Sequence, residues 1–265
     1  MIKLVVTDMD GTLLNDEKQL PPDFWDVANL LNEHNVLLCI ASGRQYYTLK
    51  EIFDQAPENI AFIAENGAFV VVQDEVLHED VMHKADAIRL LEQGRKVQNA
   101  NLILCCKNGA YVEGTDEKFL EIARQHYYKL SVVDDLTQVD DAVLKITLCD
   151  FDNSERNSLG YFSGFGDNFK ISVSGEIWLD IVNSEVNKGA ALRRLQQKLD
   201  ITREETAVFG DYLNDLEMMK EGKFSFAMKN SHPDIAKIAA EITKHDNNGF
   251  GVTNTIKELF SGSNY

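Results

Sequence analysis

Apolar runs alternate with amphipathic segments in the first part of the chain, and the same alternation returns near the C-terminus. This alternation is typical of a parallel sheet whose strands are joined by helical crossovers. The sequence therefore predicts a doubly wound α/β domain to which both ends of the chain contribute. The predicted strands are 4–7, 36–41, 207–209 and 225–228, and the predicted helices are 22–33, 46–53 and 188–199.

The middle of the chain has a different pattern. A hairpin is predicted at Glu65-Asn66-Gly67, between the apolar runs 60–63 and 69–72. Beyond it, strands and helices are mixed without regular alternation, which is typical of a separate α+β domain. We place the first domain at 1–82 and 186–265 and the inserted domain at 83–185. In the inserted part, helices are predicted at 85–97, 117–127 and 153–165, and strands at 102–106, 143–149, 170–173 and 178–182.

The acidic segment Asp8-Met9-Asp10-Gly11-Thr12 directly follows the first predicted strand. Ligands of open α/β sheets bind beyond the carboxyl ends of the strands, so Asp8 and Asp10 are expected in that crevice. Neighbouring carboxylates repel each other unless a proton or a cation lies between them, and oxygen ligands without a His or Cys cluster favour Mg²⁺ over zinc. A plain turn is the alternative, because Asp-Gly is a common turn dipeptide. The segment alone leaves both interpretations open.

Polar groups of related kinds follow the other predicted strands or begin the helices after them. Because parallel strands bring their carboxyl ends together, these groups are expected to meet at one edge of the sheet. A carboxylate nucleophile, a hydroxyl, an ammonium and a Mg²⁺ site are what phosphoryl transfer needs, since that chemistry is mostly positioning and charge neutralisation. The groups are Ser42, Gly43 and Arg44, then Lys188, then Asp211, Asn214 and Asp215.

With these segments in this order, the sequence resembles the haloacid dehalogenase (HAD) superfamily of phosphatases, and within it the Cof-type, sugar-phosphatase-like branch of subfamily IIB. Glu65-Asn66-Gly67-Ala68 and Gly249 also resemble that branch. The four motifs of the family are matched by Asp8 to Thr12, by Ser42 with Gly43 and Arg44, by Lys188 within Asn187-Lys188-Gly189, and by Asp211 to Asp215.

The spacing of the motifs identifies the subtype. Only 33 residues lie between Asp8 and Ser42, which leaves no room for a cap domain there, whereas the stretch from Arg44 to Lys188 has that room. The resemblance therefore implies a Rossmann-like HAD core, a doubly wound parallel sheet, with an inserted α+β cap domain of the C2 type. It also implies that the cap sets substrate specificity.

The resemblance further implies a role for each motif residue. Asp8 would attack the phosphorus and form an aspartyl-phosphate, while Asp10 would protonate the leaving alcohol and later deprotonate the hydrolytic water. Ser42 would donate a hydrogen bond to a phosphoryl oxygen, and Lys188 would offset the phosphoryl charge. The other implied roles are Mg²⁺ binding by Asp8, the Asp10 carbonyl, Asp211 and Asp215, and substrate contact by Gly43, Arg44 and Asn214 alongside Ser42 and Lys188.

Composition limits the partners. The formal net charge of -17 argues against a nucleic-acid or anionic-membrane surface, which would need clustered Lys and Arg. The four cysteines form no C-x-x-C pair, which favours buried thiols in a reducing compartment. No long apolar span is present, and Met1 leads almost directly into the first strand, so we expect a cytoplasmic protein. The tail from Ser261 to Tyr265 is expected to be disordered.

The predicted function is Mg²⁺-dependent hydrolysis of a small phosphomonoester, either a sugar phosphate or a phosphorylated cofactor. Two alternatives stay open. A phosphomutase of the same superfamily would share the aspartyl-phosphate chemistry but would pass the phosphoryl group to a second hydroxyl. A non-catalytic phosphometabolite-binding protein would keep the fold without turnover, although the intact Asp10 speaks against it.

Overall fold

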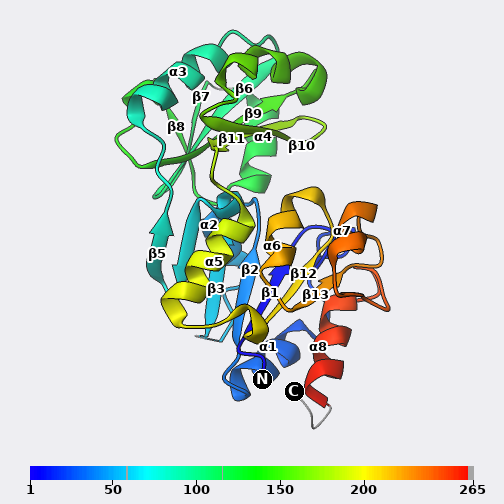
Figure 1. The fold of residues 1–265 in the computed structure, drawn as a ribbon. Coiled ribbons are helices and arrows are strands. Elements are labelled where there is room, and N and C mark those ends of the chain that lie inside the picture. The colour runs from blue at the N-terminus through cyan, green and yellow to red at the C-terminus, as the bar shows by residue number, and fades with distance from the viewer. Residues whose placement is uncertain (58, 115, 262–265) are drawn as a thin grey trace. The chain divides into compact units, whose positions relative to one another are not determined.

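The structure, a computed structural model, describes residues 1–57, 59–114 and 116–261. Contacts divide the chain into two compact units, whose elements are labelled in Figure 1. Unit 1 comprises Met1–Gly43, Phe53–His78 and Asn187–Tyr265, and unit 2 comprises Arg44–Ile52 and Glu79–Val186. The tail was expected to be disordered from Ser261, but Ser261 is the last residue of the helix Gly251–Ser261. Residues 262–265 lie outside the described residues.

Unit 1 is built on an eight-stranded sheet with the order β14-β13-β12-β1-β2-β3-β4-β5. The central strands pair in parallel and are buried along their whole length, as expected for strands covered on both faces. The predicted doubly wound parallel sheet is therefore confirmed. The strands are β1 (Leu4–Asp8), β2 (Leu37–Ala41), β3 (Ile60–Ala64), β4 (Phe69–Val72), β5 (Glu75–Glu79), β12 (Thr206–Gly210), β13 (Phe224–Ala227) and β14 (Glu241–Ile242).

The described helices of unit 1 connect several of its strands, and α8 follows the last strand. Helix α5 packs Ala191, Leu192 and Leu195 into the same apolar cluster as strands β1 and β2, so its first residue is held near the sheet. A capping box precedes β12, because the Glu205 carboxylate accepts hydrogen bonds from the Thr202 amide and hydroxyl at 2.9 Å. The helices are α1 (Phe24–Glu33), α5 (Lys188–Leu199), α6 (Leu216–Lys220), α7 (Pro233–Ile238) and α8 (Gly251–Ser261).

Unit 2 contains a six-stranded sheet with the order β10-β11-β9-β6-β7-β8. Alternate residues of β6 face opposite sides, so α3 (Lys84–Gly94) packs on Leu102 and Leu104, and α4 (Glu117–His126) packs on Ile103 and Cys105. The strands are β6 (Ala100–Cys106), β7 (Gly109–Glu113), β8 (Leu130–Val133), β9 (Val143–Asp150), β10 (Phe169–Gly175) and β11 (Trp178–Asn183).

Helix α2 (Tyr46–Ile52) belongs to unit 2 by its contacts. The Thr48 hydroxyl donates to the His126 carbonyl at 3.0 Å and accepts from the Tyr128 amide at 3.0 Å. Gln45 exchanges two hydrogen bonds of 3.1 Å with the backbone of Lys129. The expected division had assigned this segment to the first domain, because the sequence alone shows only its position between two strands.

The structure corrects the helix predicted at 153–165. Residues Ser154–Ser158 form a π-helical turn, and Leu159–Phe165 continue as a 3-10 helix. The buried Asp150 carboxylate accepts hydrogen bonds from the Ser158 hydroxyl and from the side-chain amide of Asn157. These bonds connect the turn to the end of β9. Glycines within the 3-10 segment also disfavour a regular α-helix. Strands β5, β7, β8 and β14 were not predicted. All four cysteines are buried thiols, as expected.

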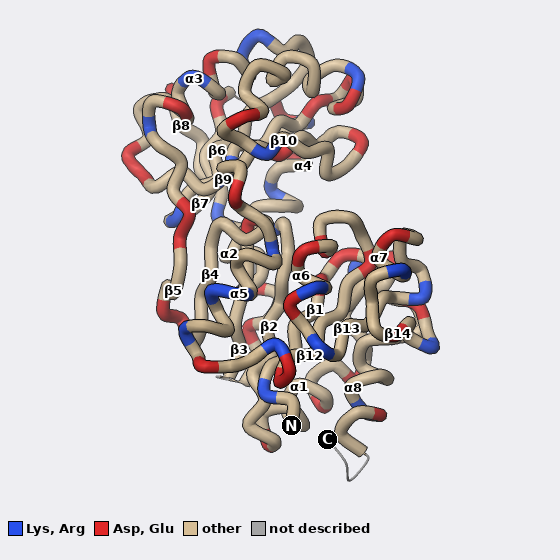
Figure 2. The backbone as a smooth tube through the Cα atoms, in the orientation of Figure 1, with Lys and Arg blue, Asp and Glu red and all other residues tan. Residues whose placement is uncertain are grey.

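No helix in the described part of the chain is long and apolar enough to span a bilayer. Lys and Arg are interspersed with Asp and Glu along the backbone of both units (Figure 2). The negative net charge is therefore distributed over many elements.

Candidate active site

Three neighbouring strands of unit 1 end beside one another. β1 lies between β2 and β12, with Asp8 opposite Ala41 and Thr7 opposite Phe209. Ser42 follows β2 directly, and Asp211 follows β12 directly. The parallel register therefore brings three of the predicted motifs to the same edge of the sheet.

An acidic cluster forms at this edge from Asp8, Asp211 and Asp215. One carboxylate oxygen from each lies within 4.8 Å of the other two, and Asp8 and Asp215 are buried. Gly11, with φ +79°, allows the close approach, because a Cβ there would lie 2.5 Å from Asp211 Oδ2. The Thr12 hydroxyl donates to Asp211 Oδ1 at 2.7 Å. The first and last motifs are therefore joined directly.

Lys188 provides the positive charge of the cluster. It is the first residue of α5, where the Asn187 side chain caps the helix by accepting from the Ala190 amide at 2.7 Å. Only 1% of Lys188 is exposed, and its ammonium donates to Asp8 Oδ1 and, at 2.8 Å, to Asp215 Oδ1. A buried ammonium is expected to be paired in this way, because an unpaired buried charge is costly.

Asp215 binds the loop after β12 in addition to the Lys188 ammonium. Its Oδ2 accepts from the backbone amides of Asp211 and Tyr212 at 3.1 and 3.3 Å. Gly210 lies against this carboxylate, since a Cβ at Gly210 would come within 2.8 Å of Asp215 Oδ2. Asp215 therefore orients both the ammonium and the Asp211 segment.

The cluster contains more negative than positive groups. Burial, and then the charge of Asp215, raise the pKa of Asp8 well above its usual value, although Lys188 opposes this shift. Burial also raises the pKa of Asp211. For Lys188, burial lowers the pKa, but Asp215 and Asp8 outweigh that effect and raise it above the ordinary value. A divalent cation would relieve the repulsion among the carboxylates, and these oxygen donors suit Mg²⁺.

The other predicted residues are not part of this carboxylate cluster. Asp10 is half-exposed, and its Oδ1 accepts from Lys18 Nζ at 2.9 Å, a partner that no motif or spacing in the sequence indicated. Ser42 is buried, Gly43 is half-buried, and Asn214 is exposed. Arg44 groups with unit 2 by its contacts. The structure thus joins Asp8, Lys188, Asp211 and Asp215 by direct or near contact, while Asn214 projects toward solvent.

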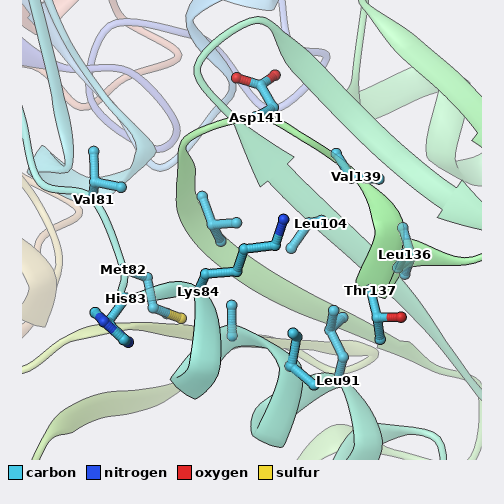
Figure 3. Close-up of a pocket in the computed structure, with 13 residues that line it drawn as sticks. Val81, Met82, His83, Lys84, Leu91, Leu104, Leu136, Thr137, Val139 and Asp141 are labelled. Atoms are coloured by element: carbon cyan, nitrogen blue, oxygen red, sulfur yellow. The ribbon is translucent and has the colours of Figure 1, made fainter.

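A separate cavity of about 410 Å³ lies within unit 2 (Figure 3). Its lining is mostly apolar, and the Lys84 side chain extends across it. The Asp141 carboxylate at its edge is held by Asn108 and Tyr111, so that carboxylate serves local structure. None of the motif residues lines this cavity.

Two bacterial proteins are similar to this chain over most of its length. The 5-amino-6-(5-phospho-D-ribitylamino)uracil phosphatase YbjI of Escherichia coli (strain K12) is 31% identical over 261 residues, covering 97% of this chain and 96% of YbjI. The HMP-PP phosphatase of Shigella flexneri serotype 5b (strain 8401) is 26% identical over 237 residues, covering 89% of this chain and 87% of that protein.

A solved structure has the same fold. SMU.1108c from Streptococcus mutans UA159 is 26% identical, with a TM-score of 0.87 over 99% of this chain and 100% of that chain. Residues 5–256 match the haloacid dehalogenase-like hydrolase family, and this range contains all four motifs. The fold, the motif order and these similarities lead to one assignment. The chain belongs to the haloacid dehalogenase-like hydrolase family, as its resemblance to that superfamily had indicated.

Proposed function

We propose that this protein is a Mg²⁺-dependent phosphatase that hydrolyses small phosphomonoesters through an aspartyl-phosphate intermediate. The observation that carries the proposal is the contact of the buried Asp8 carboxylate with the Lys188 ammonium at the end of β1, within a cluster of three carboxylates. The similarity to two phosphatases of small phosphorylated metabolites supports the same reaction.

Asp8 is the proposed nucleophile. One of its carboxylate oxygens attacks the phosphorus, the bond from phosphorus to the substrate oxygen breaks, and Asp10 gives its proton to that leaving oxygen. Water then attacks the phosphorus of the aspartyl-phosphate, and Asp10 takes a proton from this water. The bond between Asp8 and phosphorus breaks, which releases phosphate and restores both carboxyl groups. The half-exposed side chain of Asp10 is compatible with contact to both substrate and water.

The surrounding residues stabilise charge. Lys188 neutralises part of the negative charge on Asp8 and on the transferred group, and Ser42 donates to a phosphoryl oxygen. Gly43, Arg44 and Asn214 are proposed substrate contacts. Asp8, the Asp10 carbonyl, Asp211 and Asp215 would hold Mg²⁺, which when bound would offset the charge that builds up on the phosphoryl oxygens.

We assign the choice of substrate to the inserted residues 83–185. The chemistry-bearing motifs all fall outside this range, so variation within it can change recognition without changing the reacting groups. The substrate class is a phosphorylated sugar or cofactor, and the protein is proposed to act in the cytoplasm. Both similar proteins are named for small phosphorylated substrates, and one of these substrates is a phosphorylated ribitylamino compound.

Phosphate release across a panel of substrates tests the proposal. The panel contains sugar phosphates, nucleotides, pyridoxal phosphate, flavin mononucleotide and p-nitrophenyl phosphate, each with Mg²⁺ and with excess EDTA. We expect stoichiometric phosphate release that needs Mg²⁺. Transfer of the phosphoryl group to a second hydroxyl, without free phosphate, would identify a mutase instead. Binding without turnover of any substrate would indicate a phosphometabolite-binding protein.

The role of Asp10 is tested by Asp10→Asn. The variant loses the acid and base but keeps the backbone carbonyl, so kcat should fall by about 10² to 10⁴. Substrates with a good leaving group, such as p-nitrophenyl phosphate, should lose less than alkyl phosphates, because their leaving oxygen needs less protonation. An equal loss for both kinds of substrate would argue against Asp10 as the acid.

A further inference from the structure

The turn between β3 and β4, residues Glu65–Gly67, has an unusual backbone. Its three residues have φ values of +50°, +57° and +108° in succession. Asn tolerates this left-handed region and Gly favours it, but Glu does not, and a non-glycine residue there costs about 1 kcal/mol or more. Such strain persists only where the surroundings impose it. Glu65 is nevertheless buried, with 1% of its surface exposed.

One side of this turn contacts the Ser42 loop. The Asn66 amide donates to the Ser42 carbonyl at 3.1 Å, and the Ser42 amide donates to the Ile63 carbonyl at 2.8 Å. A Cβ on Gly43 would lie 3.0 Å from Asn66 Oδ1, so the Asn66 side chain packs directly on this glycine. Both backbone polar groups of Ser42 are therefore bound by β3 and the turn that follows it.

The other side of the turn contacts the start of α5. A Cβ on Gly67 would lie 2.5 Å from the Asn187 carbonyl oxygen and 3.2 Å from the Lys188 amide nitrogen. Gly67 lacks that atom, so its backbone can lie against the residue that caps α5. The contact is at the base of the Lys188 side chain, whose ammonium reaches Asp8.

We propose that the Glu65–Gly67 turn is a positioning element that fixes the Ser42 hydroxyl and the Lys188 ammonium relative to each other. Ser42 follows β2 and Lys188 begins α5, so nothing in the local sequence sets their separation. The turn touches the backbone of both. A simple hairpin connection would require neither contact nor three successive left-handed residues. This inference rests on the proposed phosphatase function, because it concerns groups that act on the phosphoryl moiety.

Gly67→Ala tests the contact with α5. The added Cβ would push on Asn187, and misplacement of a catalytic group by about 1 Å can lower kcat by about 10². Gly114→Ala is the matched control, because Gly114 has φ +86° and its Cβ would meet no atom within 4 Å. We expect both variants to lose some thermal stability from strain. Only Gly67→Ala should lose kcat, by about tenfold to a hundredfold, measured with p-nitrophenyl phosphate.

Asn66→Gly tests the contact with Ser42 and remains informative if Gly67→Ala does not fold. Glycine accepts the positive φ and removes only the side chain that packs on Gly43. We expect kcat to fall about tenfold in the parent, and this effect to be lost in a Ser42→Ala background, because the turn acts through Ser42. A merely structural role would give the same factor in both backgrounds.

Three results would count against the inference or its basis. Folded Gly67→Ala with the kcat of the parent would show that the contact with α5 does not position Lys188. Independent effects of Asn66→Gly and Ser42→Ala would show that the turn does not act through Ser42. A parent protein that releases no phosphate from any substrate would instead remove the proposed function, and this inference with it.

Discussion

Two buried lysines, one in each unit, show different uses of a buried charge. Lys188 in unit 1 and Lys145 in unit 2 are 1% and 2% exposed. Lys188 contacts two aspartates and belongs to a cluster with three carboxylates. Lys145 Nζ lies 3.9 Å from Asp180 Oδ1, and that oxygen also accepts from the Thr147 hydroxyl at 2.6 Å.

The difference lies in how many carboxylates converge. In unit 2, Asp180 lies near Lys145 and accepts from a neutral hydroxyl, whereas three carboxylates converge in the unit 1 cluster and two of them contact Lys188. A buried ion pair can serve the fold alone. Converging buried carboxylates need a further cation or proton, which makes the unit 1 cluster a candidate site for chemistry.

The largest expected effect comes from removing the proposed nucleophile, Asp8. Asp8→Asn should lower kcat by about 10⁴-fold or more, since no covalent intermediate can form, while circular dichroism remains unchanged. Asp180→Asn is the matched change at the Lys145–Asp180 pair and should retain turnover of p-nitrophenyl phosphate. A comparable loss in both variants would contradict the proposed difference between the two units, because it would give the unit 2 pair a part in the reaction.

The two lysines themselves provide the next test. Lys188→Met should lower kcat by about 10² to 10³, because it removes a preorganised charge from the transition state. Lys145→Met should instead destabilise the fold by about 3 to 5 kcal/mol, because Asp180 would be left buried without its cation. Urea unfolding and phosphate release, measured on both variants, separate the two effects. Unchanged stability of Lys145→Met would contradict the structural role of the pair.

The converging carboxylates predict that Mg²⁺ stabilises the protein. At a Mg²⁺ concentration of 100 times Kd, the free energy of unfolding should rise by about 2.7 kcal/mol, visible as an increase in Tm. Asp211→Asn, which removes one carboxylate of the cluster, should reduce that increase. Asp180→Asn should keep it. Equal Mg²⁺ responses in all three proteins would place the cation elsewhere.

The smallest effect is expected at the surface, where Lys3 pairs with Glu205 at 2.6 Å. The hydrogen bond from Lys3, followed by those from Thr202, lowers the pKa of Glu205 to about 2. A carboxyl group with a lowered folded-state pKa stabilises the protein above its unfolded-state pKa and loses that contribution as the pH falls toward 2. Glu205→Gln should therefore destabilise the protein slightly at pH 7, and the difference should shrink between about pH 5 and pH 2. Urea unfolding across this range measures it, and a constant difference would exclude the ion pair as its cause.

Most of the candidate site could be predicted because its residues follow local patterns. Asp8 ends an apolar strand, Asp211 directly follows one, and Lys188 begins a capped amphipathic helix. Parallel pairing brings such positions together. The doubly wound sheet followed from the same alternation of strands and helices. The metal-binding and catalytic roles themselves stay predictions.

Contacts between distant segments had no comparable signal. The pair Thr48 and His126 joins residues 78 positions apart, so the sequence around either gives no reason to group α2 with unit 2. Lys18 was missed as the partner of Asp10 for a related reason, since an exposed lysine in a loop is common in any protein. The short strands β7 and β8 and the π-helical turn depend on tertiary hydrogen bonds that local propensity does not report.

The bond from Thr12 to Asp211 joins residues 199 positions apart, and it has a consequence for biosynthesis. A chain emerging from the ribosome exposes the β1 segment early, but β12 and the loop that carries Asp211 and Asp215 emerge only much later. Asp8 consequently has no complete set of partners while translation is under way. Nascent or prematurely terminated chains that lack this loop should be inert toward cellular phosphate esters, so reactivity is delayed until β12 and the loop that follows it have been synthesised.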